Sequence, residues 1–142
     1  MKTTINPYLI FDGNCEEAFL FYRSVFQSEF SYIGRFSEIP PQENFKVPEE
    51  FHNRILHVSL PISEGFILMG SDDSGYNDGN QPGFIQGNNI SININLGKKE
   101  EADSLYEKLS EGGKILMPMS VTFWNAYFGM FCDKFGINWM IN

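Results

Sequence analysis

INPYLIFDG, residues 5–13, and ISININLG, residues 90–97, decide the fold of this chain. Each begins as a strand-like run and passes through a glycine into an amphipathic helix, and three more strand-like runs follow each helix. One strand–helix–three-strand unit cannot cover both of its apolar faces alone. The repeat therefore predicts the α+β class, with two βαβββ modules that form a curved mixed sheet around a cavity and carry their helices on the outer face.

The expected organisation is a single domain over residues 1–142, in which a polar linker joins the two modules. Module one is expected at about 1–72 and module two at about 90–142. The linker, at about 73–89, is rich in Gly, Asn and Asp and interrupts the apolar pattern. Its carboxylates lack the spacing of an EF-hand, so no calcium site is predicted there.

Local signals give the boundaries of the helices and strands. Asn14 is expected to cap the first helix, with Glu17 three residues on as in a capping box, and Phe21 is expected in its apolar stripe. The second helix is expected over Lys99–Ser110. The other strand-like runs lie at 31–37, 54–60 and 66–69 in module one and at 114–119, 127–133 and 137–142 in module two.

Composition excludes several classes of protein and partner. Hydrophobic residues make up 42% and aromatic residues 15% of the 142 residues, which excludes disorder. The formal net charge of −8 repels a phosphate backbone, so nucleic acid is not an expected partner. No apolar run approaches the roughly 20 residues that span a bilayer, and no signal-peptide pattern is present. We therefore expect no membrane partner, a cytoplasmic location and two reduced thiols, Cys15 and Cys132.

Motifs at both ends and in the middle of the chain point to a family: YLIFDGNCEEA at 8–18 with FY at 21–22, LHVSL at 56–60, TFW at 122–124 with FG at 128–129, and DKFGINWMIN at 133–142. With these motifs the chain resembles the vicinal oxygen chelate superfamily, which includes glyoxalase I, extradiol dioxygenases and bleomycin-resistance proteins. Within it the chain is most similar to the PhnB-like subgroup, also labelled 3-demethylubiquinone-9 3-methyltransferase-like. The last motif is the most specific.

This resemblance implies two βαβββ modules, commonly assembled as a homodimer, and it implies where a divalent metal would be held. Enzymes of the superfamily place His or Glu on the first and last strands of each module. Overlaying the two halves of this chain puts Asn6 (or Pro7), Met69, Ser91 and Met140 at those positions. None of these is His, Asp, Glu or Cys. A thioether can help to bind copper(I), but without a thiolate or imidazole beside it core packing is favoured, so no metal and no cofactor are predicted.

Strand alternation predicts which side chains face the cavity. His57 is the candidate catalytic residue, because it is the one group expected there that could act as an acid or base near neutral pH. The alternative is a structural histidine whose ring is satisfied by a neighbouring hydroxyl or carbonyl. On the strand that carries His57 and Ser59, Leu56, Val58 and Leu60 take the opposite face. Trp139 has the opposite parity to the cavity residues and is expected in the core. The expected ligand-binding residues are Tyr8, Ser59, Met69, Asn93, Trp124 and Met140.

Three functions are compatible with these patterns. The favoured one is a PhnB-like protein that binds a small apolar or aromatic molecule in a metal-free cavity of a homodimer. The second is an enzyme of the lyase, isomerase or dioxygenase type that uses His57 as acid or base, with or without a non-standard metal site. The third is an interaction role with a vestigial cavity. Methyl transfer has no support, because no strand, Gly-rich loop and helix start for a nucleotide-like cofactor is present.

Overall fold

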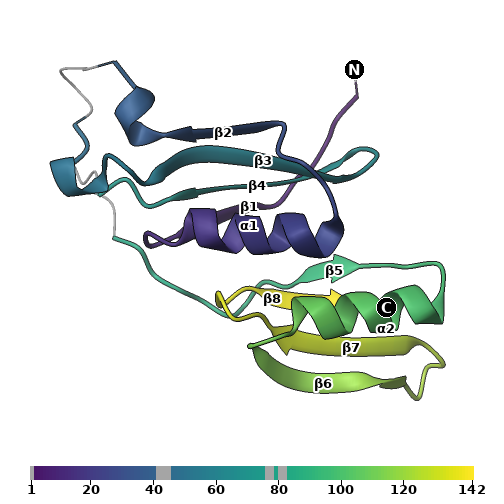
Figure 1. Ribbon diagram of the computed structural model, residues 1–142. Helices are drawn as coiled ribbons and strands as arrows, with labels where there is room; N and C mark the ends of the chain where they lie inside the picture. Colours follow the sequence, from purple (N-terminus) through teal and green to yellow (C-terminus); the bar gives the residue numbers. More distant parts are fainter. Residues whose placement is uncertain (1, 41–45, 76–78, 80–82) are drawn as a thin grey trace. The chain divides into compact units, whose positions relative to one another are not determined.

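The computed structural model describes residues 2–40, 46–75, 79 and 83–142. The chain divides into two compact units, Met1–Ile85 and Gln86–Asn142 (Figure 1). Each unit holds one βαβββ module, which confirms the α+β class and the duplicated plan. The described strands form two four-stranded sheets, one in each unit, where the sequence predicted one curved sheet.

The first unit places its helix on one face of a mixed sheet with the strand order β1-β4-β3-β2. The edge strand β1 runs parallel to β4, and the other neighbours are antiparallel. Helix α1 contacts β3 and β4. The elements are β1 (Tyr8–Phe11), α1 (Cys15–Phe26), β2 (Tyr32–Arg35), β3 (Ile55–Ser63) and β4 (Phe66–Asp72), with the short 3-10 helices η1 (Phe36–Glu38) and η2 (Glu49–Phe51) between β2 and β3.

The core of the first unit lies between α1 and the first sheet. Val58 and Leu60 of β3 are fully buried, as strand alternation predicted. Phe19 of α1 is also fully buried and reaches the sheet at Gly70 of β4. A Cβ atom on Gly70 would lie 2.7 Å from the Phe19 ring, so the absence of a side chain there sets how closely the helix approaches.

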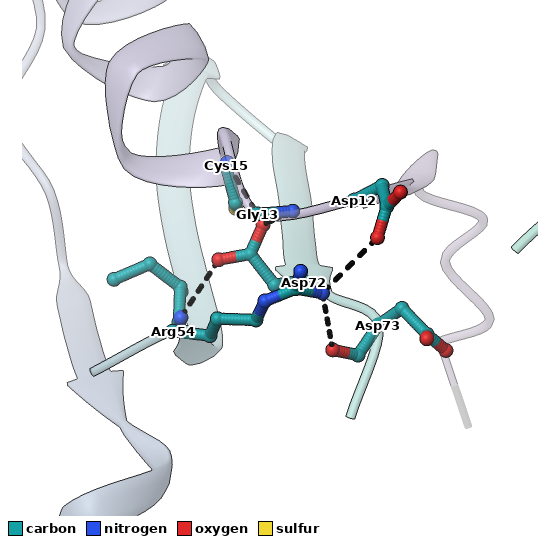
Figure 2. Close-up of polar contacts among 7 residues, drawn as sticks. Asp12, Gly13, Cys15, Arg54, Asp72 and Asp73 are labelled. Carbon is teal, nitrogen blue, oxygen red and sulfur yellow. Dashed lines mark hydrogen bonds and ion pairs between the residues drawn. The ribbon is translucent and has the colours of Figure 1, made fainter. Parts of the chain in front are cut away.

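The start of α1 is held by a residue from the other end of the module, not by the predicted capping box. Asn14 occupies the N-cap position but its side chain makes no capping hydrogen bond. The carboxylate of Asp72 instead accepts the backbone N–H groups of Gly13 and Cys15 through Oδ1, both at 2.9 Å, and that of Ile55 through Oδ2 at 2.9 Å (Figure 2). Asp72 is 3% exposed, so one buried carboxylate joins β4 to β3 and to the helix start.

Arg54 closes the same end of the first sheet. Its Nη1 donates to Asp12 Oδ1 and to the Asp73 carbonyl, each at 3.2 Å (Figure 2). Its guanidinium also lies 3.6 Å from the ring centroid of Phe51. These contacts hold η2 and the β1–α1 turn at the carboxyl ends of β1 and β4, so this end of the sheet is structural.

The second unit repeats the arrangement with the strand order β5-β8-β7-β6. Trp139 is 2% exposed, which confirms its predicted place in the core. Its indole Nε1 donates to Asp133 Oδ2 at 2.8 Å, while Asp133 Oδ1 accepts the backbone N–H groups of Phe135 and Ile137. The elements are β5 (Ile92–Ile94), α2 (Lys99–Leu109), β6 (Lys114–Val121), β7 (Tyr127–Cys132) and β8 (Asn138–Ile141).

The first strand of each unit is shorter than the predicted runs, Ile5–Phe11 and Ile90–Leu96, and at β1 the cause is Pro7. Pro7 has no N–H to donate, although its carbonyl accepts the N–H of Met69 at 3.1 Å. The side chain of Asn6 takes over the pairing, because its Oδ1 accepts the Ile67 N–H at 3.1 Å.

In the part of the chain that the structure describes, no helix has the length and apolar character needed to cross a membrane.

Candidate functional site

The candidate site lies on the face of the first sheet that is turned away from α1, which we call the first open face. A row of directly paired residues crosses all four strands there: Tyr8 pairs with Met69, Met69 with Ser59, and Ser59 with Tyr32. Residues paired in this way point to the same face. His57 lies two residues before Ser59 and shares its face. The sheet therefore brings together four predicted site residues, since His57, Tyr8, Ser59 and Met69 come from three of its strands.

His57 is the centre of a short chain of hydrogen bonds. Its Nδ1 lies 3.1 Å from the hydroxyl of Tyr8, and its Nε2 lies 2.9 Å from the hydroxyl of Ser59. Each hydroxyl can donate or accept, so either neutral tautomer of the ring can be satisfied. The structure thus places His57 in the arrangement of the structural alternative, in which hydroxyl groups satisfy the ring.

Two tyrosine rings lie on either side of the imidazole. The ring of Tyr8 is stacked on His57 with centroids 5.5 Å apart, and that of Tyr32 is tilted at 5.9 Å. Tyr8 is 45% exposed and Tyr32 is 50% exposed. Ile10 extends the apolar surface and is similarly exposed. Flat, half-exposed side chains around one polar group can stack on a planar ligand and orient it through a hydrogen bond.

The positions that hold a divalent metal in the superfamily do not fit such an ion in this chain. In the first unit the side-chain oxygen of Asn6 already accepts a hydrogen bond from the Ile67 N–H, and Met69 carries a thioether, which is a soft ligand. In the second unit the corresponding residues are Ser91 and Met140. Within the described residues, no three His, Cys, Asp or Glu side chains gather in a way that could hold a metal ion. The side chains at these positions lack the carboxylate and imidazole ligands that a catalytic divalent ion needs.

The other three predicted ligand-binding residues belong to the second unit. Asn93 pairs with Met140 across β5 and β8, so these two share a face. The Asn93 amide donates to Asn95 Oδ1 at 3.2 Å and accepts from Asn142. Trp124 lies in the turn between β6 and β7, where its ring contacts Phe128. Their role in ligand binding stays a prediction, as does that of the residues on the first open face.

Tyr32 is the site residue that the sequence did not single out. The sequence carried a weak signal for Tyr32, since it lies within residues 31–37, which were predicted to form a strand. Alternation alone could not place Tyr32 beside His57, because that requires the pairing of β2 with β3 and its register.

The two thiols are poor nucleophiles. Cys15 is fully buried, and burial raises the pKa of its thiol far above the ordinary value, with smaller contributions from the carboxylates of Asp72 and Glu16. Burial also raises the pKa of the half-buried Cys132, with the Asp133 carboxylate adding to the effect. Both thiols stay protonated near neutral pH.

Comparison with known proteins places the whole chain in one family. A family model described as 3-demethylubiquinone-9 3-methyltransferase matches residues 3–142. The protein YjdN of Escherichia coli K12 is 31% identical over 144 residues, which cover 97% of this chain and 93% of YjdN.

Two solved structures are similar over nearly their full length. Protein PA1353 of Pseudomonas aeruginosa is 38% identical with a TM-score of 0.81, covering 99% of this chain and 97% of its own. The PhnB protein of Bacillus cereus is 28% identical with a TM-score of 0.74, covering 99% and 98%.

Proposed function

We propose that this chain, which belongs to the 3-demethylubiquinone-9 3-methyltransferase family, binds a small apolar or aromatic molecule. The family is the PhnB-like branch of the vicinal oxygen chelate superfamily. The binding surface in this proposal is the first open face, and His57 is its orienting polar group. The observation that carries the proposal is the cluster of three rings in which Tyr8 is stacked on His57 and Tyr32 is tilted against it, half-exposed on a sheet face that α1 does not cover.

The chemistry of this face favours a flat ligand with few polar groups. Tyrosine and imidazole rings offer planar surfaces, and Met69 beside Tyr8 adapts to irregular shapes. The polar contacts are limited to hydroxyl groups and the imidazole, all of which can donate or accept. A ligand oxygen or nitrogen could replace either hydroxyl at His57 without leaving the ring unpaired.

A second candidate function is acid–base catalysis by His57. The observation in its favour is the contact of the Tyr8 hydroxyl with Nδ1, because a relay from Tyr8 through the imidazole to Ser59 could move a proton. The hydrogen bonds of the ring go to neutral hydroxyl groups, and no carboxylate among the described residues is hydrogen-bonded to it to raise its basicity. Binding is therefore the function that we propose first.

The test uses neutral aromatic probes, namely 2-naphthol, indole and quinoline, with thermal shift and amide NMR as readouts. We expect at least one probe to stabilise the protein and to shift the resonances of β1 and β3. Binding should weaken at least tenfold in His57→Ala, because both the stacking surface and the hydrogen bond are lost. Failure of all three probes, or binding that His57→Ala leaves unchanged, would overturn the proposal.

A matched pair of variants separates the hydrogen bond from the stacking. Tyr8→Phe and Tyr32→Phe both keep the aromatic ring, but only Tyr8 has its hydroxyl against His57. One neutral hydrogen bond contributes about 0.5–1.5 kcal/mol, or roughly 2- to 13-fold in affinity. Tyr8→Phe should change the affinity by this amount, whereas Tyr32→Phe should leave it nearly constant. The homodimer that the resemblance implies stays a prediction, which light scattering after size-exclusion chromatography would check.

A further inference from the structure

The second unit carries a row of three thioethers on adjacent strands. Met140 of β8 is paired directly with Met130 of β7, and Met130 is paired with Met117 of β6. The ladder between β6 and β7 is irregular on both sides of Met117, but Met117 still lies opposite Met130. Side chains in directly paired positions of a regular ladder have Cβ atoms about 4.5–5.5 Å apart. A methionine side chain has three rotatable bonds, so the outer two sulfur atoms can reach toward the central one.

This row lies on the face of the second sheet that is turned away from α2, which we call the second open face. Phe131, Trp139 and Ile141 alternate with these methionines along β7 and β8 and are buried. The ring of Tyr106 of α2 packs edge-on against Phe131, which marks that face as the core face. Met130 and Met140 therefore point away from α2, and Met117 shares their face because it is paired with Met130.

The methionines of the row are not sealed in a core. Met117 is 39% exposed, and Met130 and Met140 are half-buried. Cys132 shares the face one pair further along β7, opposite Asn138 and Lys114. A core of packed apolar side chains would not leave three thioethers accessible in a line with a thiol beside them.

We propose that the second open face binds a soft monovalent cation, of the class of copper(I), through the sulfur atoms of Met117, Met130 and Met140. Thioethers are soft, uncharged ligands that select copper(I) over hard ions such as magnesium, calcium or manganese. The sequence predicted no metal at Met140, because it placed no thiolate or imidazole beside this thioether. The strand register supplies two further thioethers instead. Cys132 lies on the same face one pair further along β7, outside the row of thioethers, and we assign it only an auxiliary place in the site.

The first unit provides an internal comparison. Met69 occupies the position in the first sheet that Met140 occupies in the second, because it pairs with the first strand of its module. Its neighbours in the row are Tyr8 and Ser59, so it has no second sulfur ligand in the row. Among the strands that the structure describes, the row of three thioethers is thus a feature of the second sheet and not of the first.

Competition for copper(I) under anaerobic conditions, with bicinchoninate as the coloured chelator, tests the proposal on the full chain. We expect one copper(I) ion per chain, a loss of affinity of at least tenfold in Met130→Leu, and no measurable binding in the variant with Met117, Met130 and Met140 all replaced by Leu. Met69→Leu should bind as the wild type does. Leucine conserves the volume of methionine, so the single variants should keep the fold, which circular dichroism would verify.

A second readout shows which sulfur atoms bind. In protein labelled with 13C at the methionine methyl groups, silver(I) should shift the signals of the three row methionines and leave that of Met69 in place, while zinc(II) should shift none of them. The proposal is overturned if the wild type does not compete with the chelator, if the triple Leu variant still binds, or if Cys132→Ser alone abolishes binding. The last result would show a thiol that binds copper(I) without the thioethers.

Discussion

Replacing Asp72 by Asn tests whether one buried carboxylate organises the first unit. Asp72 Oδ1 accepts two N–H groups at the start of α1, and Oδ2 accepts the N–H of Ile55. An Asn side chain has nearly the same shape, and its single oxygen can keep the first two bonds. Its NH2 group would then face the Ile55 N–H, so that two donors meet in a buried place.

The size of the effect follows from these three bonds. A hydrogen bond to a charged group contributes about 1.5–3 kcal/mol, and leaving a buried donor unsatisfied costs about 1–3 kcal/mol. Asp72→Asn loses one such bond and weakens two others by removing the charge. We expect the free energy of unfolding of the first unit to fall by about 2–4 kcal/mol.

Urea unfolding gives the total loss, and amide hydrogen exchange gives its location. The amide of Ile55 should exchange faster in Asp72→Asn by a larger factor than those of Gly13 and Cys15. Asp73→Asn is the matched control, because within the described residues Asp73 makes its hydrogen bonds through its backbone, and we expect a change within about 0.5 kcal/mol. Equal stability of the two variants, together with unchanged protection of Ile55, would refute the reasoning.

Two further predictions concern a thiol and a glycine of the same unit. Because the folded-state pKa of Cys15 is raised above its ordinary value of 9.0, its contribution to stability is complete below pH 9 and falls above it, by about 1.4 kcal/mol per pH unit. Unfolding measured from pH 7 to 11 should show this extra slope in the wild type and in Cys132→Ala but not in Cys15→Ala; parallel curves would contradict it. Gly70→Ala should destabilise by about 1–3 kcal/mol, because its Cβ would meet the Phe19 ring at 2.7 Å, whereas Gly83→Ala meets nothing within 4 Å and serves as the control in the same denaturation assay.

The repeated plan was predictable because strand alternation and helical spacing are patterns of residues close together in the sequence. Alternation identified Val58, Leu60 and Trp139 as core residues, and each is buried. Helical spacing located α1 and its stripe included Tyr22, which is fully buried, but it also included Phe21, which is only half-buried, and it missed the fully buried Phe19. The stripe could not fix the exact rotation of the helix, because close approach at a single glycine decides it.

Features that depend on partners distant in the sequence could not be predicted. The start of α1 is held by Asp72, which the chain supplies 57 residues after Cys15, so the local Asn14 signal was misleading. On β3 a register shift opposite β2 buries Ile55 and leaves Leu56 only half-buried, although alternation assigned Leu56 to the core face. A bulge inserts one residue on one strand and reverses the parity beyond it, and nothing in the run itself reports it.

The candidate site shows the same division between local and distant information. Alternation placed His57 and Ser59 on one face, and overlay of the two halves aligned Met69 with Met140, which the pairing of each with the first strand of its module bears out. Neither method could show that Tyr8 would stack on His57. That contact needs the strand order β1-β4-β3-β2, which brings the two ends of the module's sequence onto one sheet.

The two halves of the repeat keep the same register but carry different chemistry on their open faces. In the first sheet the row next to Met69 holds tyrosine and serine hydroxyls, while in the second sheet the row next to Met140 holds two more thioethers. A duplicated fold conserves the geometry that packing enforces, and the exposed face is free to diverge because its side chains contribute little to the core. Each half is thus a natural control for the other. Exchanging Met130 for Ser would give the second row the polar character of the first, and it should remove soft-metal binding while leaving Trp139 and the core of the second unit in place.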